Sequence, residues 1–415
     1  MIKGQLRLLV RLWRLQPPRD LLWKVVRWSW ALVAREFAWQ LSLLVALAIA
    51  VLVAFGAAGS TVGAVAVALL GLDLVFLLRL AWDSYRSAGV IERELQEVPG
   101  EPAESRFPRS HLVLPPLMLI PRGVRKQRGL VYHEDDGLRL RLDIYRPADA
   151  ALDSRRRPAV IQVHGGGWIA GSRLEQGIPL LNHMAANGWV GFNVDYRLSP
   201  RATLPDHVID VKRAIAWVRE NSDELGVDPD RICLTGGSAG GHLTALAALT
   251  ADDRSLQPGF EDADTSVAAA VPFYGVYDML DEDAVYYEGL RSWLLEGVVI
   301  KRRRTDDADA FRAVSPTFRV HAGAPPFMVF HGERDSLVPV DDARAFVERL
   351  RAVSHEEVLY VELPGAEHAF DLFPSLRTAR VVEGIERFLR TVVAPPPEEP
   401  GTGAGVPPER IVSVR

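Results

Sequence analysis

A serine in a glycine-rich turn is the first residue whose surroundings could do chemistry. Ser238 lies in Gly236-Gly237-Ser238-Ala239-Gly240, a G-x-S-x-G pattern that follows the apolar residues 232–234. In a strand-to-helix turn of this kind the serine hydroxyl is exposed at the edge of a sheet, and the flanking glycines remove Cβ atoms that would collide with neighbouring backbone. The pattern alone also fits an ordinary glycine-rich turn, so Ser238 needs partners elsewhere in the chain.

A second glycine run could supply one of those partners. His164-Gly165-Gly166-Gly167-Trp168 follows the apolar residues 159–163. The main-chain N–H groups of these glycines, together with that of Ala239, could bind the oxyanion that forms when a serine attacks a carbonyl carbon. Trp168 and Tyr274 are the residues expected to line the substrate pocket.

A serine hydroxyl also needs a base and a carboxylate that orients the base. After this kind of turn the expected order along the chain is serine, acid, histidine. His368 follows the predicted strand 358–363, whereas His355 precedes that strand and is the weaker candidate. Asp335 follows the predicted strand 327–330 and is the expected acid, with Glu333 in reserve.

Short apolar runs alternate with amphipathic helical stretches from residue 129 onward. This alternation predicts an α/β fold with a mostly parallel sheet of eight strands, the first pair antiparallel around Asp136-Gly137. The predicted strands are 129–133, 138–145, 160–163, 190–194, 232–235, 267–273, 327–330 and 358–363. The main predicted helices are 205–221, 239–250, 341–353 and 378–392.

The chain divides into five predicted segments. A basic, Trp-rich juxtamembrane segment (1–38) and a transmembrane helical hairpin (39–80) are followed by a Pro-rich connector (81–128). The catalytic domain (129–392) contains a long aromatic insertion at about 276–325, which we predict to be a helical lid. The Pro- and Gly-rich tail (393–415) is predicted to be disordered.

Residues 41–58 contain no charged side chain, and a second apolar run extends from Thr61 to Leu80. The first run is long enough to cross a bilayer, whereas Asp73 weakens the second. The alternative is a buried hairpin of a soluble domain. Ahead of the runs, Arg7, Arg11 and Arg14 share one helix face, a pattern typical of a helix in the lipid headgroup layer.

Charge around the apolar runs predicts the sidedness of the chain. The loop between the runs is uncharged, while both outer flanks carry Lys and Arg. The positive-inside rule therefore places both ends of a hairpin, and the catalytic domain, on the cytoplasmic side of the plasma membrane. A single span would place the catalytic domain on the extracytoplasmic side. Membrane lipids are the expected partners of the N-terminal region.

Composition excludes several other classes of protein. Apolar residues make up 48% of the chain and charged residues 24%, with a formal net charge of −5, so the chain is not a disordered or collagen-like polymer. The acidic balance gives no support for nucleic-acid binding. Cys233 is the only cysteine, which excludes an internal disulfide and a metal site built from cysteines.

These motifs, in this order, resemble the α/β-hydrolase fold and, within it, the hormone-sensitive-lipase-like esterases. The resemblance covers residues 129–392 and includes the run Asp195-Tyr196-Arg197-Leu198-Ser199-Pro200, which it implies is structural. The whole chain, with its apolar N-terminal region, is similar to membrane-associated lipase/esterases of mycobacteria and other actinobacteria. The resemblance implies Ser238 as nucleophile, His368 as base and Asp335 as its orienting acid, with no metal or organic cofactor. It also implies that the oxyanion donors are the N–H groups of Gly166, Gly167 and Ala239. Gly237 is a departure, because the family often has Asp before the serine.

Three functions remain open at this point. The first is a membrane-anchored serine hydrolase that cleaves carboxylic esters, with short or medium acyl chains and lipid-like substrates, through an acyl-enzyme on Ser238. The second is an amide or aryl-formamide hydrolase with the same residues. The third, favoured least because His368 is present, is a non-catalytic module that binds a ligand in the same cleft.

Overall fold

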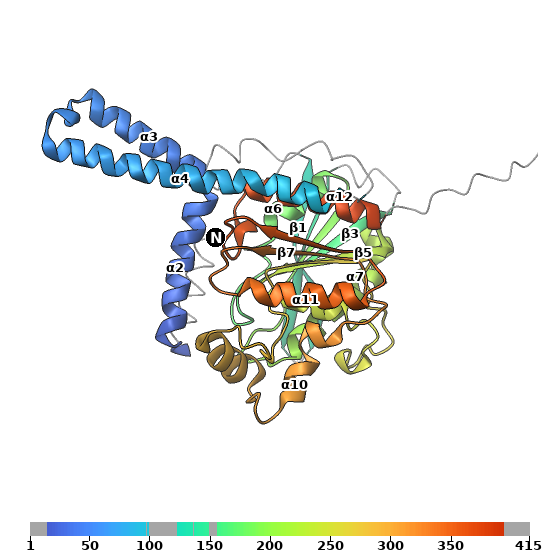
Figure 1. Ribbon diagram of the computed structural model, residues 1–415. Coiled ribbons are helices and arrows are strands. Elements are labelled where there is room, and N and C mark those ends of the chain that lie inside the picture. The colour runs from blue at the N-terminus through green and yellow to red at the C-terminus, as the bar shows by residue number, and fades with distance from the viewer. Residues whose placement is uncertain (1–14, 97, 99–122, 136, 149–155, 394–415) are drawn as a thin grey trace, which may run out of the picture.

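The computed structural model describes residues 15–96, 98, 123–135, 137–148 and 156–393 (Figure 1). Three predictions lie wholly or largely outside these residues: the basic helix containing Arg7, Arg11 and Arg14, the Pro-rich part of the connector, and the tail after residue 393.

The centre of the molecule is one sheet of eight strands, as predicted. The strands are β1 (Val124–Asp135), β2 (Leu138–Pro147), β3 (Arg157–Val163), β4 (Val190–Val194), β5 (Val227–Gly237), β6 (Ala269–Phe273), β7 (Phe327–Gly332) and β8 (Val358–Leu363). Their spatial order is β1-β2-β4-β3-β5-β6-β7-β8. β2 is antiparallel to both β1 and β4, and the strands from β4 to β8 are parallel, which confirms a mostly parallel sheet.

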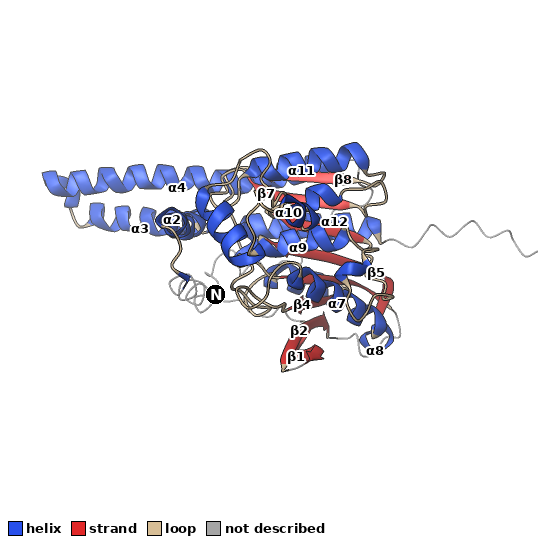
Figure 2. Cartoon of the chain, turned by 90° about the horizontal axis from the view of Figure 1, so that it is seen from below, coloured by secondary structure: helices blue, strands red, loops and turns tan. Residues whose placement is uncertain are grey.

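Helices cover both faces of the sheet. Successive side chains of a strand point to opposite sides, and here both sets are mostly apolar and buried. Val160 and Cys233 belong to one buried cluster, whereas Ile161 and Leu234 belong to the other. α6 (Ile178–Ala186) and α12 (Leu376–Val392) pack on the first face, and α7 (Asp206–Glu220), α9 (Ala239–Ala248) and α11 (Val340–Val353) pack on the second (Figures 1 and 2). The short α8 (Ser222–Leu225) precedes β5.

The region predicted as a lid is partly helical. It contains η4 (Gly289–Ile300), a π-helix, followed by α10 (Ala308–Ala313) and the short 3₁₀ helix η5 (Pro316–Arg319). Two other 3₁₀ turns, η3 (Arg254–Leu256) and η6 (Phe370–Leu372), follow α9 and β8. The insertion lies between β6 and β7, so it stands beside the carboxyl ends of the central strands, where ligands bind in open α/β sheets.

Among the described residues, three α-helices precede the sheet: α2 (Arg19–Glu36), α3 (Ala38–Ala54) and α4 (Thr61–Glu94), with the 3₁₀ turn η1 (Ala57–Gly59) between the last two. α3 and the first half of α4 run side by side away from the domain that contains the sheet (Figures 1 and 2). α4 continues past Leu80, and its second half packs on α12. α2 lies against the domain that contains the sheet instead of extending the hairpin (Figure 1).

α4 is the one described helix that is by itself long and apolar enough to cross a membrane. Its 34 residues correspond to about 51 Å. α3 has 17 residues and meets the same test only when joined to α2, from which it is bent by 76°. Asp73 is exposed on α4.

Candidate active site

Ser238 occupies a sharp turn between β5 and α9. Its backbone has φ 58° and ψ −121°, a conformation that costs free energy for a residue with a Cβ atom. Its N–H donates to the carbonyl of Phe273 at 2.9 Å, which ties the turn to the neighbouring strand β6. The next residue, Ala239, begins α9 and is completely buried. Ser238 therefore stands at a helix N-terminus, where developing negative charge is favoured.

The glycine loop after β3 lies next to this turn. Gly166 has φ +120°, and a Cβ there would lie 2.3 Å from the carbonyl oxygen of Ala170, so only glycine fits. The N–H of Gly165 donates to Oε1 of Gln176 at 2.7 Å. Within the described ranges, the N–H groups of Gly166 and Gly167 donate to no protein acceptor. They remain available for an oxyanion.

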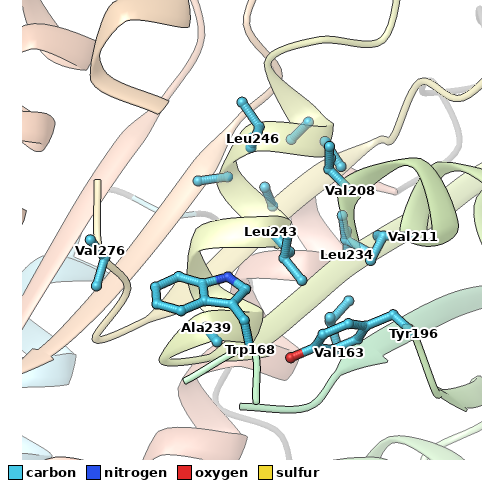
Figure 3. Close-up of a cluster of buried hydrophobic side chains, with 14 of the residues drawn as sticks. Val163, Trp168, Tyr196, Val208, Val211, Leu234, Ala239, Leu243, Leu246 and Val276 are labelled. Atoms are coloured by element: carbon cyan, nitrogen blue, oxygen red, sulfur yellow. The ribbon is translucent and has the colours of Figure 1, made fainter. Parts of the chain in front are cut away.

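The Trp168 side chain is almost fully buried beside Ala239, the residue after Ser238 (Figure 3). Its Nε1–H donates to Nδ1 of His242 at 3.2 Å, and His242 Nε2 in turn contacts the carbonyl of Val314 at 2.8 Å. Burial lowers the pKa of His242 to about 4, so Nδ1 is free to accept. Figure 3 shows the indole beside Ala239, within the apolar cluster that supports the start of α9. Trp168 also contributes to the lining of the cavity described below.

His368 and Asp335 meet although 33 residues separate them. Nδ1 of His368 lies 2.7 Å from Oδ2 of Asp335, and both side chains are almost fully buried. Burial would raise the pKa of Asp335, but the His368 and His331 imidazoles outweigh that effect and hold this pKa well below its usual range. Asp335 is therefore a carboxylate suited to orient an imidazole.

The backbone and a second histidine hold the Asp335 carboxylate in place. Its Oδ1 accepts the N–H groups of Leu337 at 2.9 Å and Val338 at 2.8 Å. His331 Nε2, which contacts the Val338 carbonyl, lies 3.2 Å from Oδ2. The sequence interpretation missed His331, although its place at the end of β7, beside the acid loop, could have suggested it.

Glu333, the reserve acid, and His355, the weaker candidate for the base, do not join this pair. The Glu333 carboxylate accepts the N–H of Gly365 at 2.8 Å, which supports the loop after β8 without contacting the His368 side chain. His355 follows α11, and its N–H donates to the Ala322 carbonyl, at the end of the sheet away from His368.

Tyr274 adjoins the histidine and explains the departure at Gly237. Its ring centroid lies 4.6 Å from that of His368, and its hydroxyl donates to the Asp371 carboxylate. A Cβ on Gly237 would lie 2.6 Å from the Tyr274 hydroxyl oxygen. A side chain before Ser238 would therefore displace this tyrosine.

Ser238, His368 and the glycine loop line one apolar cavity of about 150 Å³. The insertion between β6 and β7 contributes a large part of the remaining wall, through Val276, Tyr287, Leu290, Trp293 and Leu294. α2 contributes Leu21, Val25 and Trp28, which sequence interpretation had assigned to a juxtamembrane segment. The signal was present, since these residues and Leu32 recur at helical spacing along one buried face.

The Asp195-Tyr196-Arg197 run lies outside this cavity and makes structural contacts. Arg197 Nε donates to the buried Asp210 at 2.8 Å, and Asp195 accepts from Arg173. The Tyr196 hydroxyl donates to the His164 carbonyl at 3.0 Å, which supports the strand end that leads into the glycine loop.

Comparison with known proteins identifies the family of the chain. The BD-FAE family model matches residues 142–350. The probable carboxylic ester hydrolase LipM of Mycobacterium tuberculosis is 48% identical over 282 residues, which are 67% of this chain and 65% of LipM. Esterase LipQ of the same organism is 44% identical over 71% of this chain and 69% of its own.

A solved structure agrees with these matches. The butyrate-bound esterase Est2 of Thermogutta terrifontis is 30% identical, with a TM-score of 0.55 over 67% of this chain and 97% of Est2. The match to LipM spans slightly less than two thirds of that protein's length. From the family model, the relatives and the eight-stranded sheet together, the chain belongs to the BD-FAE family of hormone-sensitive-lipase-like esterases, on the α/β-hydrolase fold.

Proposed function

We propose that this protein is a membrane-anchored serine carboxylic ester hydrolase that forms an acyl-enzyme on Ser238. The observation that carries the proposal is the shared cavity: Ser238 at its strained turn and His368, paired with Asp335 at 2.7 Å, line the same apolar space. A nucleophile, a base with an orienting carboxylate and unpaired N–H groups are the parts that acyl transfer requires.

The reaction follows from these positions. Asp335 holds the Nδ1–H of His368, which leaves Nε2 to take the Ser238 hydroxyl proton as Oγ attacks the ester carbonyl. The resulting oxyanion accepts hydrogen bonds from the N–H groups of Gly166, Gly167 and Ala239. Collapse expels the alcohol, which takes the proton from His368. A water molecule, deprotonated by His368, then attacks the acyl-enzyme, and the carboxylic acid leaves as Ser238 regains its proton.

The apolar lining supports an ester with a short or medium acyl chain as substrate. The butyrate in Est2 and the esterase names of LipM and LipQ agree with this choice. An amide or aryl formamide would use the same residues, but no feature of the cavity favours it over an ester. A panel of p-nitrophenyl acyl esters and N-formyl aryl amides measures the preference directly.

Replacement of the nucleophile tests the mechanism. Ser238→Ala should abolish ester hydrolysis and labelling by a fluorophosphonate probe, because no other hydroxyl occupies the turn. Ser255→Ala, on an exposed turn, is the matched control and should hydrolyse and label like the unmodified chain. Retained hydrolysis in Ser238→Ala would refute the proposal.

The exposed apolar surface of the helical hairpin supports membrane anchoring. Leu44 on α3 is 62% exposed, Leu72 on α4 is 69% exposed and Phe55 at the tip is 88% exposed. Such a continuous apolar surface is costly in water. The full-length protein should float with liposomes in a density gradient, and Leu47→Glu with Leu69→Glu should weaken that flotation.

The hairpin also supports the proposed sidedness. α2 and the second half of α4 both lie against the catalytic domain, so both ends of the hairpin are on its side (Figure 1). With Lys and Arg on those flanks, we place the catalytic domain in the cytoplasm. Protease added to intact cells should leave it uncut, and cleavage without lysis would refute this placement.

A further inference from the structure

One face of α2 lies against the active-site loops. Leu21, Val25, Trp28 and Leu32 recur every three or four residues and are all buried, whereas Trp30 on the opposite face is 76% exposed. Leu21, Val25 and Trp28 line the cavity that contains Ser238. α2 is therefore packed as part of the catalytic domain, although it is joined directly to the hairpin.

Two side chains of this helix donate hydrogen bonds to the loop that carries the base. The indole Nε1–H of Trp28 donates to the main-chain carbonyl of His368 itself, at 2.8 Å in a buried position. At the penultimate residue of the helix, the guanidinium of Arg35 donates to the carbonyl of Gly365 at 2.7 Å. The same loop is thus held at two carbonyl groups by two residues of α2.

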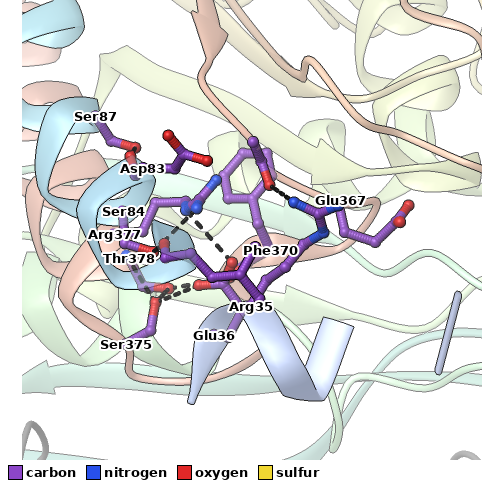
Figure 4. A network of polar contacts seen from close by, with 12 residues as sticks. Arg35, Glu36, Asp83, Ser84, Ser87, Glu367, Phe370, Ser375, Arg377 and Thr378 are labelled. Atoms are coloured by element: carbon purple, nitrogen blue, oxygen red, sulfur yellow. Dashed lines mark hydrogen bonds and ion pairs between the residues drawn. The ribbon is translucent and has the colours of Figure 1, made fainter. Parts of the chain in front are cut away.

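The end of α2 is fixed on the other side of that loop. Glu36 accepts a hydrogen bond from the Ser375 hydroxyl at 2.6 Å, and its carboxylate lies 3.3 Å from Nε of Arg377. Both members of the ion pair are fully buried. Figure 4 shows Arg35 and Glu36 at the end of α2, reaching opposite parts of the segment from Gly365 to Thr378.

We propose that α2 is a positioning element for the catalytic base, and that Trp28 and Arg35 act on His368 through its loop. The inference rests on the proposed function, in which His368 takes the serine proton. Proton transfer depends on placing the imidazole to within a fraction of an ångström. The loop after β8 has little regular structure of its own, and Ala369 has φ 61°, so its position depends on outside contacts.

The indole N–H matters because the carbonyl that it contacts is buried. A buried carbonyl that loses its donor loses a hydrogen bond and gains no water in exchange. Without the Trp28 N–H, the loop is expected to shift toward another donor and carry the imidazole away from Ser238. Because Asp335 is fixed by its own backbone donors, such a shift also lengthens the contact between His368 and Asp335.

The test replaces the donor and keeps an aromatic ring. In the full-length protein, Trp28→Phe should lower kcat for p-nitrophenyl butyrate about three- to tenfold, with KM nearly unchanged, as expected for the loss of one hydrogen bond. The rate of inactivation by a fluorophosphonate should fall by a similar factor. Trp30→Phe, on the exposed face of the same helix, is the matched control and should behave like the unmodified chain. The thermal midpoint of each variant shows whether it is folded.

Three results would overturn the inference. The first is a kcat for Trp28→Phe equal to that of Trp30→Phe. The second is a change confined to KM, which would make Trp28 a substrate contact only. If Trp28→Phe does not fold, Arg35→Met is the deciding variant, because Arg35 is only half-buried and contacts the same loop. The third result is an unchanged kcat in Arg35→Met. Ser238→Ala serves separately, since activity there would refute the proposed function itself.

Discussion

The carboxylate of Asp335 is surrounded by hydrogen-bond donors, which makes Asp335→Asn a sharp test of the site. The N–H groups of Leu337 and Val338 point at Oδ1, while His368 Nδ1 and His331 Nε2 point at Oδ2. An asparagine side chain replaces one of these two acceptors with an NH₂ group, which can only donate. The substitution therefore places a donor against two donors, whichever way the amide is turned.

The asparagine amide can turn its NH₂ group toward the backbone N–H groups or toward the histidines, and only the histidines can become acceptors. Backbone N–H groups cannot become acceptors, but an imidazole can exchange tautomers. The amide should therefore turn its NH₂ toward His368, which would then accept at Nδ1 and carry its hydrogen on Nε2. In that tautomer the base cannot take the Ser238 proton. Loss of the productive tautomer in such a triad costs about 10⁴-fold in kcat, or about 5.4 kcal/mol of transition-state stabilisation.

The assay is steady-state hydrolysis of p-nitrophenyl butyrate at pH 7 by the full-length protein, with fluorophosphonate labelling as a second readout. Asp341→Asn is the matched control, because Asp341 is on the exposed face of α11, where it pairs with Arg344, and it should keep the activity of the unmodified chain. If folded Asp335→Asn retains kcat within tenfold, the tautomer argument and the assignment of Asp335 both fail.

Three further predictions concern the packing around the site. Arg377→Met leaves Glu36 buried without its partner and should lower the free energy of unfolding by about 3–5 kcal/mol. The control Arg380→Met breaks a partly exposed pair with Glu383 and should lower it by less than about 1 kcal/mol. Equal losses in urea titrations of the two variants would contradict this prediction. Burial raises the pKa of Asp342 to about 6, so the stability that its proton supplies is complete below about pH 4 and is lost as the pH rises through 6. Between about pH 4 and 6, the melting temperature of the unmodified chain should therefore fall relative to that of Asp342→Asn. A difference between the two melting temperatures that stays constant with pH would contradict this prediction. Val25→Trp should narrow the cavity and lower kcat/KM for decanoyl esters about tenfold more than for butyryl esters, and an unchanged ratio would show that Val25 does not face the acyl chain.

The sheet could be predicted because its signals are local. Each strand is a short apolar run bounded by turn residues, and the alternation with helices fixes a mostly parallel arrangement. All eight predicted strands are present, most of them longer than predicted. The helix ends were also close, since α11 begins at Val340 and α12 ends at Val392.

The proposed catalytic residues could be predicted for a related reason. Residues at the carboxyl ends of parallel strands meet at one edge of the sheet, so Ser238, Asp335 and His368 follow from strand order and chemistry. The outer parts of the site did not follow in this way. The space for a side chain at Gly237 is taken by Tyr274, which follows a different strand. His331 contacts Asp335 only because the loop after β7 folds back toward it.

The sequence by itself determined the fold class and the order of the proposed nucleophile, acid and base, because covalent spacing and strand periodicity act over a few residues. It also marked an apolar N-terminal region, but could not say where α2 packs. Only the tertiary structure brought Trp28 to the carbonyl of His368, 340 residues away. Such a contact depends on how α2, α4 and α12 pack together around one loop, and no local sequence pattern determines that packing.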